Sequence, residues 1–283
     1  MAQIKLVATD LDGTFLTDGM ESHPENRRVV QACKARGIPV CACTGRNWGA
    51  CKRIVWQNGL SEYCVTNNGA SVVDTRTGEI RYRNRFEPES VRRIVEMSLE
   101  MDCQTVSISG HDATYLYRDR AEYFFRHLPQ EILDLPKGQW MELKWFDTAR
   151  EMIEAAADDA ERINVGLRRE ADLAPFCRRC EQIRPVEIAA SGFGHIEVTA
   201  KDGTKAEALS VLADIYNCGP ENVMALGDSF NDLHMLLWAG TGVAMGNADE
   251  HVKAIADFVT KTNTEAGFAY AVERMIGLEG TKG

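Results

Sequence analysis

Short apolar runs that end in polar tips recur at both ends of this 283-residue chain. The run at residues 4–9 leads into Asp10-Leu-Asp-Gly13, and the run at 222–226 leads into Gly227-Asp-Ser-Phe-Asn-Asp232. Segments with a helical apolar stripe separate such runs, which is typical of a parallel α/β sheet. Because parallel strands end at one edge of their sheet, polar tips collect there. We therefore predict a Rossmann-like parallel sheet with helices on both faces and chemistry at its carboxyl edge.

Further segments follow the same alternation. The run at 38–43 ends in Thr44-Gly45-Arg46, and the run at 63–66 ends in Asn67-Asn68-Gly69. Two more short strands are expected at 241–246 and 257–260. A helix is expected from Pro24, which suits a first helical position, to a stop at Gly37, and another over 206–216.

The pattern changes between about residue 84 and residue 194. An amphipathic helix with Val91, Ile94, Val95 and Leu99 precedes alternating segments at 104–109 and 113–117, which indicate half-exposed antiparallel strands. We predict a core formed by residues 1–83 and 195–283, and an inserted α+β domain formed by residues 84–194.

Composition limits the possible partners. The chain has 42 acidic and 32 basic side chains and a net charge of −10, so its surface repels nucleic acid and anionic membranes at long range. No run approaches the ~20 apolar residues of a membrane span, and charges at Lys5, Asp10 and Asp12 argue against a signal peptide. We expect a cytoplasmic protein whose nine cysteines are reduced thiols, without nucleic-acid or membrane partners.

The two carboxylates of Asp10 and Asp12 follow the first predicted strand on a glycine-containing loop. One carboxylate of such a pair can attack an electrophile while the other transfers protons. Paired carboxylates also attract a divalent cation, and hard oxygen ligands favour magnesium. The alternative for this motif alone is a turn that carries solvated acids, which the pairing of two carboxylates makes the less favoured of the two interpretations.

Three further motifs have weaker signals of their own. The second acidic tip, with Asp228, Asn231 and Asp232, can add metal ligands from another strand, or it can be a turn with a helix cap. Thr44 and Gly45 can bind an anion through a hydroxyl and backbone amides. Lys205 opens a predicted helix against its dipole, so it is either a surface residue or a partner for an anion.

In their order along the chain these motifs resemble the haloacid dehalogenase (HAD) superfamily. The resemblance rests on Asp10-Leu-Asp-Gly-Thr14, Thr44-Gly-Arg46, Lys205 and Gly227-Asp-Ser-Phe-Asn-Asp232. Two more segments, Asn68-Gly69-Ala70 and Gly242-Val-Ala-Met-Gly-Asn-Ala248, resemble its Cof-type branch, which carries a large α/β cap between the second and third motifs. The resemblance implies that residues 84–194 form this cap.

The resemblance also implies a role for each motif residue. Asp10 is expected to be the nucleophile and Asp12 the general acid and base. Thr44, Gly45, Lys205 and Asn231 are expected to bind the substrate phosphoryl group. Mg²⁺ is expected to be bound by the Asp10 carboxylate, the Asp12 main-chain carbonyl and Asp228. Asp232 is expected to support these groups without binding the ion directly.

We therefore predict a Mg²⁺-dependent phosphatase that hydrolyses a small phosphorylated metabolite, such as a sugar phosphate or phosphorylated cofactor, through an aspartyl-phosphate. A phosphomutase on the same core is one alternative. A phospho-acceptor or phosphometabolite sensor without hydrolytic activity is another, although a long-lived phospho-signal gains nothing from the base Asp12. A homodimer is expected from base rates alone.

Overall fold

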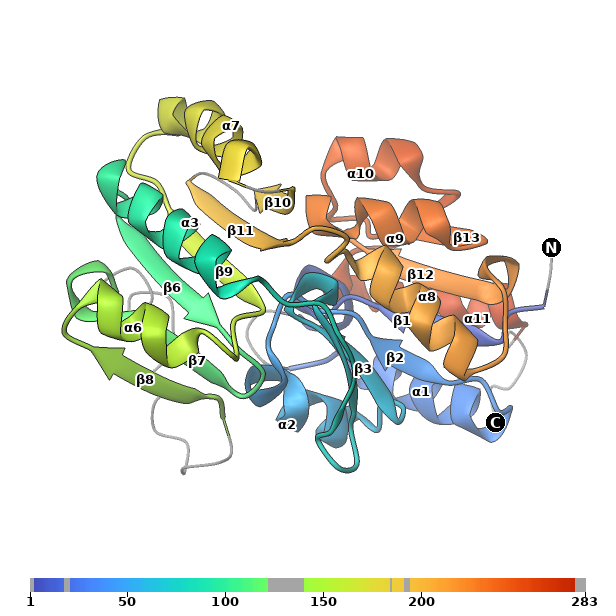
Figure 1. The fold of residues 1–283 in the computed structure, drawn as a ribbon. Helices are drawn as coiled ribbons and strands as arrows, with labels where there is room; N and C mark the ends of the chain where they lie inside the picture. The colour runs from blue at the N-terminus through green and yellow to red at the C-terminus, as the bar shows by residue number, and fades with distance from the viewer. Residues whose placement is uncertain (1–2, 18–20, 122–139, 184, 191–193, 278–283) are drawn as a thin grey trace. The chain divides into compact units, whose positions relative to one another are not determined.

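The computed structural model describes residues 3–17, 21–121, 140–183, 185–190 and 194–277 (Figure 1). Contacts between residues divide the chain into two units. Unit 1 comprises residues 1–45, 53–82 and 204–283, and unit 2 comprises residues 46–52 and 83–203. The first unit is thus formed from both ends of the chain.

Unit 1 is built on a five-stranded sheet in which all neighbouring strands are parallel. Its order is β14-β13-β12-β1-β2. The strands are β1 (Leu6–Thr9), β2 (Val40–Ala42), β12 (Val223–Gly227), β13 (Thr241–Ala244) and β14 (Phe258–Val259). Every residue of β1, β2 and β12 is buried, as expected for strands covered on both faces. The predicted sheet is confirmed.

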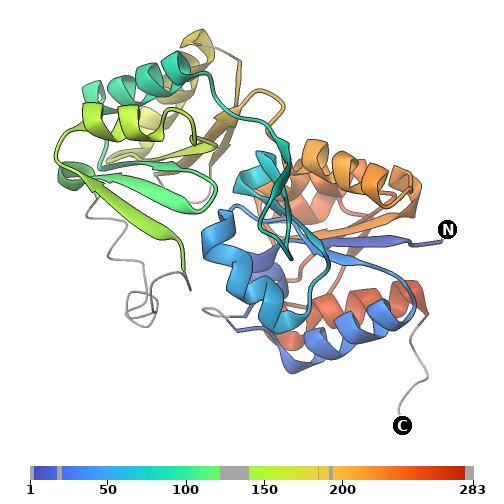
Figure 2. The ribbon, with the colours of Figure 1, turned by 60° about the horizontal axis from the view of Figure 1, so that its bottom comes forward.

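Helices cover both faces of this sheet (Figure 2). On one side lie α1 and α11, and on the other lie α8 and α9. The helices of unit 1 are α1 (Pro24–Ala35), α8 (Lys205–Ile215), α9 (Leu233–Trp238), α10 (Glu250–Ile255) and α11 (Gly267–Ile276); α2 (Trp48–Asn58) begins in unit 2 and ends in unit 1. Helix α1 starts at Pro24 and is followed by Gly37 in a left-handed conformation, as its sequence predicts.

The third predicted strand of the core has a different partner from the one expected. β3 (Tyr63–Thr66) contacts β2 through an isolated parallel bridge between Cys43 and Val65. It pairs along its length with β4 (Ser71–Asp74), antiparallel, in a three-stranded sheet completed by β5 (Ile80–Arg83). The turn between β3 and β4 is short enough for a hairpin, so β3 pairs with the strand that follows it in the sequence.

Unit 2 contains a six-stranded sheet of order β10-β11-β9-β6-β7-β8. Its strands are β6 (Thr105–Ser109), β7 (Ala113–Tyr117), β8 (Glu142–Phe146), β9 (Arg162–Gly166), β10 (Val186–Ala190) and β11 (His195–Ala200). All pairs are antiparallel except β7 with β8. The expected antiparallel strands are therefore present, with one parallel pair at the edge.

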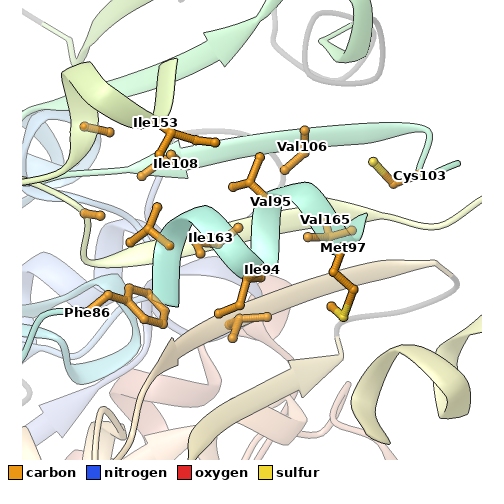
Figure 3. Close-up of a cluster of buried hydrophobic side chains, with 14 of the residues drawn as sticks. Phe86, Ile94, Val95, Met97, Cys103, Val106, Ile108, Ile153, Ile163 and Val165 are labelled. Atoms are coloured by element: carbon orange, nitrogen blue, oxygen red, sulfur yellow. The ribbon is translucent and has the colours of Figure 1, made fainter. Parts of the chain in front are cut away.

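Three helices pack on one face of this sheet: α3 (Pro88–Glu100), α6 (Ala149–Ala156) and α7 (Leu173–Ile183). Figure 3 shows Ile94 and Val95 of α3 against the strands that carry Ile108 and Ile163. The alternation of apolar and polar residues along β6 places one set of side chains in this core. Unit 2 therefore has a hydrophobic core of its own.

Unit 2 differs from the predicted insertion of residues 84–194 at two places. β11, assigned to the core from its sequence, pairs with β9 and β10 in the sheet of unit 2. Residues 46–52 also group with unit 2; within it, the Asn47 amide donates to Ser109 Oγ at 3.3 Å and to the Ala113 carbonyl at 3.2 Å. Neither assignment is visible locally, because both depend on long-range pairing.

Two further observations concern the helices and the cysteines. Within the described part of the chain, no helix combines the length and apolar character required to cross a membrane. All nine cysteines are free thiols.

Candidate active site

The strand register of unit 1 aligns the polar tips. Thr9, the last residue of β1, lies beside Leu226 of β12 and Ala42 of β2. The Asp10 N–H continues this pairing by donating to the Leu226 carbonyl at 2.9 Å. Asp10, Thr44 and Asp228 therefore leave three adjacent strands at the same edge.

Lys205 lies at the centre of the acidic cluster. Its ammonium Nζ is 2.6 Å from Asp10 Oδ1 and 2.6 Å from Asp232 Oδ1, and its side chain is fully buried. Lys205 is the first residue of α8, after the N-cap Thr204, so the positive end of the helix dipole opposes its charge. The two carboxylates offset both this repulsion and the loss of hydration.

The cluster holds more negative than positive charge, and the pKa values reflect this. Burial raises the pKa of Asp10; Lys205 opposes that shift, but Asp232 and Asp228 add to it, and the pKa stays well above its ordinary value. Burial lowers the pKa of Lys205, but Asp10 and Asp232 outweigh it, so the net shift is upward. The pKa of Asp10 therefore rises mainly through burial, whereas the pKa of Lys205 rises because two carboxylates surround its ammonium.

Asp228 has a different environment from Asp10. Burial and then the charge of Asp232 raise the pKa of Asp228 to about 6. Thr14 Oγ1 donates to Asp228 Oδ1 at 2.8 Å, and Ser229 Oγ donates to Asp228 Oδ2 at 3.2 Å. These hydroxyls orient a half-buried carboxylate that faces other carboxylates.

Asp232 is fully engaged by protein groups. Its Oδ1 pairs with Lys205, while its Oδ2 accepts from the backbone N–H groups of Asp228 and Ser229 at 2.9 and 3.0 Å. The side chain therefore fixes both the ammonium and the loop that carries Asp228. These contacts are compatible with the supporting role expected for Asp232, which stays a prediction.

The loop after β1 separates the two carboxylates that the sequence pairs. Asp10 is buried, whereas Asp12 is exposed and has extended backbone angles of φ −76° and ψ 123°. Gly13 has φ +77°, and a Cβ there would lie 2.4 Å from Asp228 Oδ2. Glycine is required because the loop passes against the carboxylate of the neighbouring strand.

Thr44 and Gly45 follow β2 at the same edge. Thr44 is fully buried; its N–H donates to the Val65 carbonyl at 3.0 Å, and its carbonyl accepts from the Asn68 N–H at 3.0 Å. Gly45 is half-buried. The backbone around Thr44 is thus held by the segment that follows β3.

Asn231 contacts a residue to which the sequence assigned no role. Its Nδ2 donates to Asn68 Oδ1 at 3.0 Å. Two other contacts were also missed: that of Thr14 with Asp228, and that of Asn247, whose Nδ2 donates to the Gly13 carbonyl at 2.8 Å. Each of these residues lies within a motif that was noted, but which atoms they meet depends on strands about 200 residues apart.

The donor set fits a hard divalent cation. Carboxylate oxygens of Asp10, Asp228 and Asp232 all lie within 4.8 Å of one another. Three carboxylates face one ammonium, and burial together with the charge of Asp232 raises the pKa of Asp228. Oxygen donors of this kind suit Mg²⁺ rather than softer metals. Since Asp232 is already engaged, Asp10 and Asp228 are the side chains that would hold the ion.

Comparison with known proteins decides the family. A family model of haloacid dehalogenase-like hydrolases matches residues 7–272. The chain belongs to this family. The resemblance drawn from the four motifs is thereby confirmed.

Relatives with assigned functions cover almost the whole chain. The 5-amino-6-(5-phospho-D-ribitylamino)uracil phosphatase YcsE of Bacillus subtilis is 29% identical over 273 residues, which cover 96% of each chain. The phosphatase YitU of the same organism, named for the same substrate, is 30% identical over 278 residues, covering 96% of this chain and 98% of its own. The expectation of an enzyme of the phosphatase type is confirmed.

Solved structures show the same fold. A haloacid dehalogenase-like hydrolase from Bacillus subtilis superimposes with a TM-score of 0.83 at 26% identity, covering 95% of this chain and 99% of its own. The subclass IIB sugar phosphatase BT4131 gives a TM-score of 0.79 at 21% identity, covering 97% and 99% of the two chains. At that identity the second likeness concerns the fold alone.

Proposed function

We propose that this protein is a Mg²⁺-dependent phosphatase that hydrolyses a small phosphomonoester through an aspartyl-phosphate on Asp10. The observation that carries the proposal is the buried Asp10 carboxylate, held by Lys205 Nζ at 2.6 Å beside Asp228. A carboxylate fixed in this way presents its second oxygen in a defined direction. Asp12, on the same loop, and Thr44, after the adjacent strand β2, supply the remaining groups for phosphoryl transfer.

The reaction has two steps, formation of the aspartyl-phosphate and its hydrolysis. A carboxylate oxygen of Asp10 attacks phosphorus while the phosphorus–oxygen bond to the leaving group breaks, and Asp12 gives its proton to the departing oxygen. Water then attacks the phosphorus of the aspartyl-phosphate and gives a proton to Asp12, and the Asp10 carboxylate leaves as phosphate is released. The exposed position of Asp12 suits a group that exchanges protons with substrate and water.

Charge compensation is the main requirement of the first step. A phosphate dianion that approaches the Asp10 carboxylate is repelled, since unit charges ~4 Å apart at an effective dielectric of ~20 interact by about 4 kcal/mol. The ammonium of Lys205 opposes this repulsion at Asp10 itself. When bound by Asp10, Asp228 and the Asp12 carbonyl, Mg²⁺ supplies charge neutralisation of the phosphoryl oxygens. Thr44, Gly45 and Asn231 are the groups proposed to hold the other phosphoryl oxygens.

The names of the relatives suggest the first substrates to test. Two of them are phosphatases of 5-amino-6-(5-phospho-D-ribitylamino)uracil, and a structural neighbour is a sugar phosphatase. These compounds share a phosphate ester on a polyhydroxylated carbon chain. We propose a substrate of this class, a phosphorylated sugar or a phosphorylated cofactor precursor.

The test is a phosphate-release assay on EDTA-treated protein, with p-nitrophenyl phosphate and a panel that contains the ribitylamino-uracil phosphate and hexose and pentose phosphates. We expect free inorganic phosphate to appear only after MgCl₂ is added, and Asp10→Asn to abolish it. Acid quenching of Asp12→Asn with labelled substrate should trap an acid-stable, hydroxylamine-sensitive label on Asp10.

Four outcomes would contradict parts of the proposal. Turnover in Asp10→Asn would exclude Asp10 as nucleophile, and turnover without metal would exclude the Mg²⁺ dependence. Transfer of the phosphoryl group within the substrate, without free phosphate, would indicate a phosphomutase. Phosphate binding without turnover on any substrate would favour the sensor.

A further inference from the structure

The segment after β3 has an unusual backbone. Asn67, Asn68 and Gly69 have φ values of +48°, +59° and +106°, so three successive residues lie in the left-handed region. Asparagine tolerates this region better than most residues, but such a run persists only where its surroundings hold it. The segment directly follows the strand beside Thr44 and lies at the start of α8.

Contacts on two sides hold the segment in place. The Asn68 N–H donates to the Thr44 carbonyl at 3.0 Å, which ties it to the loop after β2. A Cβ on Gly69 would lie 2.0 Å from the Thr204 carbonyl oxygen, so the backbone passes directly against the N-cap of the helix that begins with Lys205. The position of Asn68 is therefore fixed relative to both phosphate-binding elements.

The Asn68 side chain contacts the segment after β12 that carries Asn231. It is 6% exposed, and its Oδ1 accepts from Asn231 Nδ2 at 3.0 Å. The terminal torsion of an asparagine has a broad energy profile, so an amide on a short loop needs a partner to hold one orientation. Asn231 Oδ1 is itself buried and, among the described residues, has no hydrogen-bond partner. The contact with Asn68 is thus the hydrogen bond seen at the Asn231 amide.

We infer that Asn68 is a positioning residue that orients the Asn231 amide for binding of the phosphoryl group. One Nδ2 hydrogen of Asn231 points to Asn68, which leaves the second hydrogen to donate to a phosphoryl oxygen. The left-handed backbone and its contact with Thr44 place the Asn68 oxygen at that point. This inference rests on the proposed function in that it takes Asn231 as a phosphate ligand.

The test is a double-mutant cycle on the affinity for inorganic phosphate, measured by calorimetry with MgCl₂ present. Glycine accepts the left-handed backbone, so Asn68→Gly removes the side chain without new strain. We expect Asn231→Ala to weaken phosphate binding about tenfold or more, and Asn68→Gly about fivefold, as for hydrogen bonds to or near a charged group. The double variant should bind no more weakly than Asn231→Ala alone.

Asn217→Gly is the matched control. Asn217 is an exposed asparagine with φ +51° that follows the other end of α8, so the chemical change is the same. It should leave phosphate affinity within about twofold of wild type, since it touches no part of the site. An equal loss in Asn217→Gly would show that the effect of Asn68→Gly is a general loss of rigidity and would overturn the inference.

Other outcomes are equally informative. An unchanged affinity in Asn68→Gly, or multiplicative losses of about fiftyfold in the double variant, would overturn the positioning role. A wild-type protein that binds phosphate but hydrolyses no substrate disproves the proposed function. Because the double-mutant cycle measures binding and not turnover, it still tests the positioning role of Asn68 in that case. A wild-type protein that does not bind phosphate disproves the inference.

A measurement on the wild-type protein covers the case in which Asn68→Gly does not fold. The side-chain amide of Asn231 can be assigned by NMR from the spectrum of Asn231→Ala. We expect one of its two protons to exchange slowly and keep its shift when phosphate is added, while the other proton shifts. Fast exchange of both protons, or equal shifts of both, would contradict the inference.

Discussion

Replacing Lys205 by methionine tests the electrostatic core of the site. The change keeps the length of the side chain but removes the ammonium that pairs with Asp10 and Asp232 at 2.6 Å. Those carboxylates, together with Asp228, then face one another without that cation. We expect both the free energy of unfolding and the rate of phosphoryl transfer to fall.

The geometry sets the size of both effects. Unit charges ~3 Å apart at an effective dielectric of ~20 attract by about 6 kcal/mol, and Lys205 has two such partners. Much of this attraction offsets the cost of burying the charges, so removal of one partner from a buried pair costs about 3–5 kcal/mol of stability. Loss of about 4 kcal/mol of charge compensation at the nucleophile corresponds to roughly a thousandfold slower reaction.

Urea unfolding at pH 7 and phosphate release from p-nitrophenyl phosphate measure the two quantities. Lys34→Met is the control, because Lys34 is an exposed lysine on α1 of the same unit. It should change stability by less than about 0.5 kcal/mol and leave turnover unchanged. The reasoning is refuted if Lys205→Met loses less than 1 kcal/mol or keeps more than about a tenth of the activity.

A second substitution separates stability from catalysis. Adding Asp232→Asn to Lys205→Met removes one of the carboxylates left unpaired, so part of the lost stability should return. Activity should not return, since Asp10 still lacks its cation. Recovery of activity together with stability would mean that Lys205 acts through folding alone.

Three other changes probe separate parts of unit 1. Asp12→Asn alters an exposed side chain, so the fold and phosphate affinity should persist while turnover falls about 10²–10⁴-fold; full turnover would exclude its role in proton transfer. Gly13→Ala combines φ +77° with a Cβ 2.4 Å from Asp228 Oδ2, so activity should require more MgCl₂, and an unchanged MgCl₂ titration would contradict this. Burial raises the pKa of Asp74, but hydrogen bonds from Arg81 and a second arginine outweigh it and lower the pKa to about 2. Because this pKa lies below the unfolded value, Asp74 stabilises the fold above about pH 4 and loses that contribution as the pH falls to 2. The contribution is about 1–2 kcal/mol, since the arginine partners of Asp74 are exposed. Urea unfolding of Asp74→Asn should therefore show a smaller loss of stability between pH 5 and pH 2 than the wild type, and an identical loss would refute this role of Asp74.

The parts of the fold that were predictable are those with a local cause. Fully apolar runs predicted β1 and β12 because parallel strands are buried on both faces, and Pro24 and Gly37 marked the ends of α1. The predictions of strand pairing were wrong where one strand has two possible partners. β3 has the composition of a core strand but pairs with the adjacent β4, and β11 completes a sheet whose other strands come from elsewhere in the chain.

The residues of the site, like the elements of the fold, were predictable only where the cause is local. Asp10, Thr44 and Asp228 were identifiable because each follows an apolar run, and strand ends of one sheet converge. Contacts between side chains from different strands, such as Asn68 with Asn231, follow from register and backbone dihedrals that no single motif contains. An asparagine followed by a glycine is typical of an ordinary turn, and the same pair occurs where the asparagine positions another side chain. The sequence alone does not distinguish these two cases.

Lys205 shows how structure changes the meaning of a residue that the sequence left open. At the start of a helix, a lysine is compatible either with solvent or with an anion. Complete burial excludes the first alternative, since an ammonium without hydration requires partners, and Asp10 and Asp232 are those partners. Asp228 is a third carboxylate beside this ion pair, so three carboxylates face one ammonium. Because Lys205 already occupies the space between Asp10 and Asp232, the Mg²⁺ that we propose would bind on the side of Asp228.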